Sequence, residues 1–361
     1  MWFVFPSEEI DLKTLFKDLE TEHTPVYISF EFLSENFLKK LSKFFGGKAH
    51  NVKLQLDIIG NLARSGNWYS NLKEDHRIIS KHLAENNNFP PQLCVDATLY
   101  QNAGATIPQE LAYALAHANE YLNHFSKDKD LEIRFLFSVG SNYFFEIAKL
   151  RALRLLYATL ASEYKVPENC NILAQPTKRD KTLYDYNVNL LRTTTQSMSA
   201  VLGGANAVYN SPYDAIYHKN NKFGDRIARN QLLVMKHESY LDKVSNAAEG
   251  AYYIETLTTQ FAEKALEIFK EIEAGGGFLK QLKEGIIQRK ISESAEKEQE
   301  QFNNGELVLI GTNKYQNPED KMNNELELFP FLKMNPRKTL IPPILEKRLA
   351  EKMEQERLEK E

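Results

Sequence analysis

The run Ile133-Arg-Phe-Leu-Phe-Ser-Val139, the segment 142–164 and the run Asn171-Ile-Leu-Ala-Gln175 decide the fold class of this chain. The two runs are short and mostly apolar, which is typical of strands buried between layers of helices. The segment between them has helical periodicity. A strand, a helix and a second strand in this order predict a βαβ unit of a parallel sheet.

The same alternation extends over the first 209 residues. We expect further strands within Trp2–Phe5, Val26–Phe32, Val52–Ile58, Leu93–Tyr100 and Ala207–Tyr209. Helices are expected at Gln109–His124 and Val188–Leu202, the second ending at Gly203 and Gly204, where a helix end favours positive φ. The pattern predicts an α/β protein and leaves both a barrel and a doubly wound sheet open.

From Phe223 the predicted elements are helices without strands, at Arg226–Tyr240, Tyr253–Ala274, Gly277–Glu284 and Lys290–Asn303. We therefore divide the chain into a βα barrel at 1–222, a helical appendage of the same domain at 223–315, and a polar linker with a charged tail helix at 316–361. The tail helix, Ile344–Lys360, is almost entirely charged, so we expect it to be solvated.

Composition excludes several classes of protein. The 45 Lys+Arg against 49 Asp+Glu give a net charge of -4, which argues against a nucleic-acid partner. The two cysteines, Cys94 and Cys170, cannot form a disulfide framework, and a reducing cytoplasm fits best. No apolar stretch approaches the roughly 20 residues of a membrane span, and no secretory signal is evident. We expect a cytoplasmic protein with no membrane partner.

Candidate sites of self-contained chemistry are weak. His117, Glu120 and His124 share one helix face, but a third good ligand is missing, so we favour a polar stripe and predict no metal site. Asp75-His76 lacks the Gly-x-Ser-x-Gly turn of a hydrolase. The glycines Gly275–Gly277 lack the preceding strand of a phosphate-binding loop.

One set of motifs is specific. Arg226-Ile-Ala-Arg-Asn-Gln-Leu-Leu-Val-Met-Lys-His-Glu-Ser239 is followed by Gly250-Ala-Tyr-Tyr-Ile-Glu-Thr-Leu-Thr258. Upstream stand Tyr100-Gln-Asn-Ala-Gly-Ala105, Asn142-Tyr-Phe-Phe-Glu-Ile-Ala-Lys-Leu-Arg-Ala152 and Ala200-Val-Leu-Gly-Gly204. Taken in chain order, these motifs resemble those of the methylmalonyl-CoA mutase family.

The resemblance implies a (β/α)8 TIM-type barrel, whose axis is threaded by the CoA substrate, and a separate cobalamin domain. It also implies adenosylcobalamin radical chemistry that isomerises methylmalonyl-CoA to succinyl-CoA. In this chain we expect such a barrel to be incomplete at its N-terminus, because the chain begins directly with a strand. The chain is then a fragment, or a late start, of a longer subunit.

Departures from the family pattern fall on the catalytic positions. The histidine that donates to the substrate thioester in catalytic members corresponds to Leu99, and the glutamate of the same motif corresponds to Asn102. A leucine side chain cannot stabilise charge that develops on an oxygen. We therefore predict no catalytic residue in this motif.

A second substrate-binding motif, Arg-Thr-His-x-Gln, becomes Asn171-Ile-Leu-Ala-Gln175, so Leu173 replaces another histidine and only Gln175 is retained. Either Glu132 or Arg134 can occupy the family's substrate-binding arginine position, and we assign neither.

The cofactor half of the family is also missing from the pattern. The resemblance assigns the lower axial ligand of cobalamin to Asp-x-His-x-x-Gly, but none of the eight histidines has an aspartate two positions earlier. The residues beyond Tyr315 are too few for a doubly wound cobalamin domain. We expect no cofactor-binding residue here, and adenosylcobalamin in a partner large subunit.

The resemblance therefore predicts the small, non-catalytic subunit of a heterodimeric methylmalonyl-CoA mutase, inactive by itself and paired with a large catalytic subunit. The alternative is an independent acyl-CoA mutase subunit that uses a cobalamin domain supplied in trans. That enzyme would rely on a residual cleft around Tyr100, Gln101 and Gln175.

Overall fold

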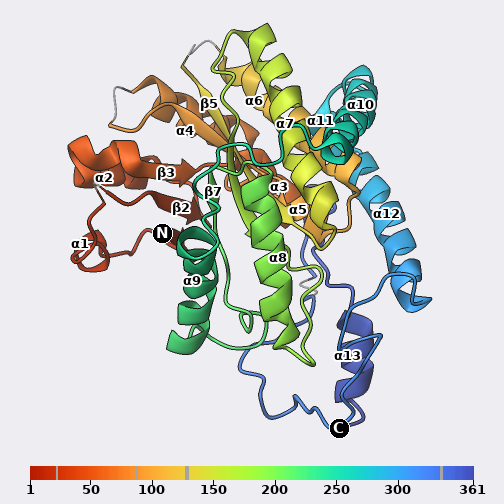
Figure 1. Cartoon of the computed structure of the whole chain (residues 1–361). Coiled ribbons are helices and arrows are strands. Elements are labelled where there is room, and N and C mark those ends of the chain that lie inside the picture. The colour runs from red at the N-terminus through yellow and green to blue at the C-terminus, as the bar shows by residue number, and fades with distance from the viewer. Residues whose placement is uncertain (22, 86–87, 127–129, 334–335) are drawn as a thin grey trace.

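The structure, a computed structural model, describes all residues except 22, 86–87, 127–129 and 334–335. Its strands lie at the centre of the molecule, with helices packed around them (Figure 1). The strands are β1 (Trp2–Phe5), β2 (Val26–Phe30), β3 (Val52–Gln55), β4 (Gln92–Asp96), β5 (Glu132–Val139), β6 (Asn171–Pro176) and β7 (Ala207–Val208). Each falls on one of the predicted runs, which confirms the α/β alternation.

The strands form two parallel sheets, β1-β2-β3 and β4-β5-β6-β7. The sheets adjoin where the Cys94 amide of β4 donates to the Leu56 carbonyl just after β3, at 3.0 Å. At the opposite edges, the Trp2 and Tyr209 rings meet edge to face at 4.9 Å. In the described part of the chain no ladder joins β1 to β7, so closure of the barrel stays a prediction.

Apolar side chains fill the space between the two sheets. Cys94, Leu136 and Leu173 of β4, β5 and β6 are buried together and contact the side chains of Trp2, Tyr27, Ala207 and Tyr209. Leu136, Leu173 and Ala207 are register partners on neighbouring strands, which aligns them on one face. The sheets therefore share a side-chain core.

The helices follow the predicted order. They are α1 (Leu12–Leu15), α2 (Glu35–Phe45), the 3-10 helix η1 (Gly46–Asn51), α3 (Ile58–Ser65), α4 (Leu72–Ala84), α5 (Thr98–Asn102), α6 (Ile107–Phe125), α7 (Tyr143–Tyr164), α8 (Val188–Leu202), α9 (Lys222–His237), α10 (Tyr252–Ala274), α11 (Phe278–Lys283), α12 (Ile286–Asn303) and α13 (Glu351–Leu358). Among the described residues, no helix has the length and apolar character needed to cross a membrane.

One strand boundary differs from the prediction. The strand expected at Leu93–Tyr100 ends at Asp96, and Leu99 and Tyr100 lie in the short helix α5. The cause is local, because the Asp96 carboxylate accepts hydrogen bonds from the Thr98 amide and hydroxyl, at 3.1 and 2.5 Å. Such side-chain to backbone bonds turn the chain away from the sheet.

The helical appendage packs on the helices that cover β5. Helix α10 lies along α6 and α7. Ile254 and Leu257 of α10 are buried against Ile147 and Ala148 of α7. The neighbouring Tyr252 is 87% exposed. The aromatic and aliphatic residues at the start of α10 are thus divided between an internal contact and the surface.

In the C-terminal segment, the helix is shorter than predicted, and several charged side chains are buried rather than solvated. Helix α13 covers Glu351–Leu358 rather than Ile344–Lys360. The prediction of a solvated helix was wrong, because Arg348, Glu351 and Glu354 are all buried. Arg348 and Glu354 form an ion pair at 2.7 Å, and the Leu183 amide donates to Glu354 at 2.6 Å. Charged side chains are rarely buried unless they are paired in this way.

We expect Leu257→Ala to lower the free energy of unfolding by about 2–5 kcal/mol, since it leaves a cavity between α10 and α7. Urea unfolding followed by circular dichroism measures this change. The matched control is Leu191→Ala, because Leu191 is 67% exposed and its truncation should change stability by no more than about 0.5 kcal/mol. Equal effects of the two substitutions would show that α10 is not docked by this contact.

Candidate functional site

A cavity of about 480 Å³ lies at the carboxyl ends of β4, β5 and β6. Ligands of open and closed parallel sheets bind at this end of the strands. The cavity is lined from the strand ends by Gln101, Gly140, Ser141, Asn142, Glu146, Thr177, Arg179 and Asp180, and from later segments by Glu298, Leu307–Leu309 and Leu349. It is the part of the described chain that best fits a family active site by position.

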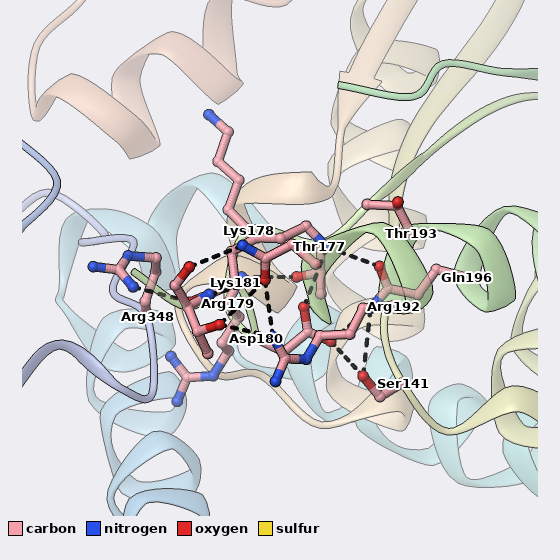
Figure 2. Close-up of polar contacts among 12 residues, drawn as sticks. Ser141, Thr177, Lys178, Arg179, Asp180, Lys181, Arg192, Thr193, Gln196 and Arg348 are labelled. Carbon is pink, nitrogen blue, oxygen red and sulfur yellow. Dashed lines mark hydrogen bonds and ion pairs between the residues drawn. The ribbon is translucent and has the colours of Figure 1, made fainter. Parts of the chain in front are cut away.

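A polar cluster follows β6 and forms one wall of this cavity (Figure 2). The Asp180 carboxylate accepts hydrogen bonds from the Ser141 hydroxyl and from the Gln196 amide, the second at 2.6 Å. The Lys181 ammonium in turn donates to the Gln196 carbonyl at 3.0 Å. Burial lowers the pKa of Lys181, which the nearby Asp180 charge only partly offsets. One Asp180 oxygen receives the hydrogen bonds from both Ser141 and Gln196, and the other oxygen lies 3.6 Å from the Lys181 ammonium.

Asn102 fixes the start of the loop after β6. Its side-chain oxygen, Oδ1, accepts hydrogen bonds from the Thr177 hydroxyl at 2.9 Å and from the Lys178 amide at 3.1 Å. The next residue, Arg179, is buried and pairs with Glu298 of α12 at 2.5 Å. The loop is therefore tied to both α5 and the appendage.

A buried ion cluster lies beneath the cavity. The Lys149 ammonium contacts Glu110 at 3.0 Å and Glu146 at 2.6 Å, and Gln101 donates to Glu146 at 3.1 Å. Lys149 and Glu110 are fully buried. Burial raises the pKa of Glu110 to about 8, with repulsion from Glu146 adding to the effect and Lys149 opposing it. One ammonium between two carboxylates favours a retained proton on the cluster.

The residues predicted to form a residual cleft are not brought together. Gln101 lines the cavity, but Tyr100 points into the core, where its hydroxyl lies 3.0 Å from Nδ1 of His117. His117 in turn contacts Asp57 at 3.0 Å. Gln175 lies on β6, is buried, and does not line the cavity.

The two leucines at the family histidine positions are both packed in apolar surroundings. Leu99 is fully buried in the main core, and Leu173 is 6% exposed and packs against Cys94 and Leu136. Both side chains are therefore part of the apolar packing of the molecule.

The possible metal ligands serve other contacts. Glu120 accepts from the Leu279 amide at 2.8 Å, and the His124 ring packs edge to face on His76 at 4.6 Å. Asp75 accepts from the amides of Tyr69 and Ser70 rather than orienting His76. Within the described ranges, no three His, Cys, Asp or Glu side chains are grouped as a metal site.

The family assignment rests on most of the chain. The sequence profile of the family described as methylmalonyl-CoA mutase matches residues 8–356. The chain belongs to the methylmalonyl-CoA mutase family.

The relatives of this chain include proteins named as a small subunit, as a large subunit and as a methylmalonyl-CoA mutase. The chain is 39% identical over 236 residues to the methylmalonyl-CoA mutase small subunit of Porphyromonas gingivalis, covering 62% of the chain and 38% of the relative. It is 38% identical over 227 residues to the methylmalonyl-CoA mutase of Rhizobium meliloti, covering 60% and 32%. It is 30% identical over 290 residues to the large subunit of Streptomyces virginiae, covering 76% and 39%. The matched part of the chain thus spans less than two fifths of the length of these relatives.

The family is cobalamin-dependent, and the cavities described at the carboxyl-end face, of about 540, 480 and 320 Å³, are lined without a histidine. The segment Pro343–Arg348 also supplies walls to the first and third of these cavities. We therefore assign no reaction step through the corrin to this chain.

Sequence reasoning missed the residues that shape this face. Thr177-Lys-Arg-Asp-Lys181 has the composition of an exposed loop, yet Arg179, Asp180 and Lys181 are buried. Their partners lie far away in sequence, at Glu298, Ser141 and Gln196, so no local pattern indicates their burial. The replacement at Asn102 was the one available signal.

We expect Glu110→Gln to flatten the dependence of stability on pH. With its pKa raised from 4.5 to about 8, the folded Glu110 keeps a proton that the unfolded chain has lost, so the free energy of unfolding falls as pH rises through this window. The contribution reaches about 1.4 kcal/mol per pH unit. Urea midpoints at pH 5, 6.5 and 8 measure it, with Glu356→Gln, an exposed glutamate, as the control. Identical slopes for wild type and Glu110→Gln would contradict the assignment.

Proposed function

We propose that this chain is the small, non-catalytic subunit of a heterodimeric, adenosylcobalamin-dependent methylmalonyl-CoA mutase. Its partner is a large subunit that carries adenosylcobalamin and the catalytic groups for the conversion of methylmalonyl-CoA to succinyl-CoA. We place the complex in the cytoplasm. Residues 1–222 act as the degenerate barrel, 223–315 as its helical appendage, and 316–361 as the segment that follows them.

The packing of Leu99 and Leu173 supports this proposal most strongly. Family chemistry needs donors that stabilise charge on the thioester oxygen, and an isobutyl group supplies none. Both leucines are buried among apolar neighbours, so restoring one donor would not create a substrate site. A fold that has lost its chemical groups can still serve through its contacts.

The filled space between the sheets points the same way. In the family resemblance, the substrate runs along the axis of the barrel. Here Trp2 and Tyr209 meet across that space, and the Trp2 indole donates to Ser29 at 2.8 Å. Tyr27 packs beside them. These aromatic side chains pack against the buried Cys94, Leu136 and Leu173, which supports a filled rather than an open interior.

The alternative, an independent acyl-CoA mutase subunit with a cobalamin domain in trans, would have to assemble its site from Tyr100, Gln101 and Gln175. Of these three, the cavity at the strand ends includes only Gln101, whose side-chain nitrogen donates to Glu146. This arrangement favours the non-catalytic subunit.

Co-expression with a large mutase subunit tests the proposal. We expect the two chains to elute together as a heterodimer in size-exclusion chromatography, and methylmalonyl-CoA to be converted by the complex. The purified single chain, supplied with adenosylcobalamin and methylmalonyl-CoA, should form no succinyl-CoA, because it lacks the donors described above. Cobalamin-dependent turnover by the single chain would instead establish the independent enzyme.

The start of α10 is our candidate for subunit contact. Tyr252 is 87% and Tyr253 55% exposed, and the Phe144 ring packs against Tyr253 at 5.8 Å. Exposed aromatic side chains of this kind often anchor interfaces. We expect Tyr252→Ala/Tyr253→Ala to abolish co-purification with the large subunit while leaving the Tm of the single chain nearly unchanged.

The control for this pair is Tyr315→Ala, since Tyr315 is 73% exposed and lies away from α10 in sequence. It should keep the complex intact. A large fall in Tm for the double variant, or retained co-purification, would remove these tyrosines from the interface.

A further inference from the structure

The C-terminal segment 344–349, here called the strap, crosses the carboxyl ends of the strands. It is held by backbone hydrogen bonds at both ends and in the middle. The Ile344 amide donates to the Ala63 carbonyl at 2.8 Å, the Lys347 amide to the Asn102 carbonyl at 3.1 Å, and the Leu349 amide to the Arg179 carbonyl at 2.9 Å. The strap thus lies where proteins with parallel sheets usually bind their ligands.

The strap inserts one carboxylate into this face. Glu346 accepts hydrogen bonds on both oxygens, from the Asn102 amide at 2.9 Å and from the Arg64 guanidinium. Arg64 also pairs with Asp96, at the end of β4, at 2.8 Å. A guanidinium and an amide that converge on the two oxygens of one carboxylate are the usual elements of a carboxylate site.

The receiving groups are positioned by the sheet and its loops rather than by the strap. Asp96 orients Arg64. The Asn102 amide cannot turn over, because its carbonyl oxygen already accepts from Thr177 and Lys178. Its amide nitrogen is therefore aimed at the position of the Glu346 carboxylate by contacts that do not involve Glu346.

The identity of residue 102 agrees with this role. The motif that contains it has a glutamate at this position in the family resemblance, and here the residue is Asn102. A carboxylate at position 102 could not donate a hydrogen bond and would repel Glu346. An adjacent cavity of about 320 Å³, lined in part by Asn102, Lys178 and Glu346, leaves a small anion room to approach.

We propose that Arg64 and Asn102 form a binding site for the carboxylate of a small organic acid, and that Glu346 of the strap occupies this site in cis. A free carboxylate enters only when Glu346 leaves. The Lys178 charge and the Arg64 charge together lower the pKa of Glu346 despite its burial, so the bound form is the anion. All the groups of this site belong to this chain.

Chemical rescue tests the site in the full-length chain. Glu346→Ala removes the side chain beyond Cβ, which has the size and charge of acetate. We expect this variant to have a lower Tm, and sodium acetate to raise that Tm by about 2–4 °C as the site saturates, since ligand binding to the folded state alone stabilises it. Sodium chloride at equal ionic strength should not.

Matched variants separate the site from general effects. Glu356→Ala removes an exposed glutamate of the same C-terminal segment and should show no acetate effect. Glu346→Gln keeps the shape but fills the site, so acetate should not stabilise it. Adding Arg64→Ala to Glu346→Ala should abolish the rescue. No rescue of a folded Glu346→Ala, or an equal acetate effect in Glu356→Ala, would overturn the proposal.

If Glu346→Ala does not fold, a second set of variants decides. Asn102→Asp places a carboxylate beside Glu346, so the amides of Lys347 and Leu349 should exchange hydrogen at least tenfold faster than in the wild type. Adding Glu346→Gln removes the repulsion and should slow this exchange again. Unchanged exchange in Asn102→Asp, or no recovery in the double variant, would overturn the proposal. Failure of the heterodimer test above would leave these measurements unaffected.

Discussion

Asn102 connects the segments at the carboxyl ends of the strands, through its side chain and its backbone carbonyl group. The carboxamide binds the loop after β6 through Thr177 and Lys178, and the strap through Glu346. The backbone carbonyl of Asn102 accepts a hydrogen bond from the Lys347 amide. Three segments that are far apart in the sequence therefore meet at one residue of α5. Because an amide can donate and accept at the same time, asparagine suits this position and a carboxylate does not.

Burial of charge is the second constraint on this end of the molecule. Lys149, Lys181, Arg348 and Glu354 are all buried, and each has an opposite charge or an amide within hydrogen-bond reach. Removing a charge from water costs several kcal/mol, so such groups persist only where partners surround them. The resulting networks fix the loop after β6, the strap and α13 in one arrangement.

The family fold is retained in this chain, while its sequence departs from the family pattern at two histidine positions. The parallel strands, the cover of helices and the family motifs are retained over residues 8–356. At the positions to which the family resemblance assigns histidines, Leu99 and Leu173 belong to apolar clusters. These replacements preserve packing, because leucine buries more apolar surface than histidine and leaves no unpaired polar group. This arrangement is the basis for proposing a subunit that acts through its contacts.

The sequence by itself determined the class of the fold. Short apolar runs and helical periodicity are local properties, so the strands and the helices α6 to α12 were predicted with errors of a few residues at their ends. The motifs identified the family. The replacement of family histidines by Leu99 and Leu173 stays a prediction from the resemblance.

The tertiary structure alone decided which polar residues are buried and what they bind. Tyr100 was predicted to line a cleft, but its hydroxyl contacts His117. Glu346 was predicted to lie in a solvated tail helix, but its carboxylate binds Arg64, 282 positions away. A run of charged residues is read as a solvated segment, because the local sequence does not show which distant residue will pair with each charge. A buried charge is stable only after the chain has folded and brought that partner within a few ångströms.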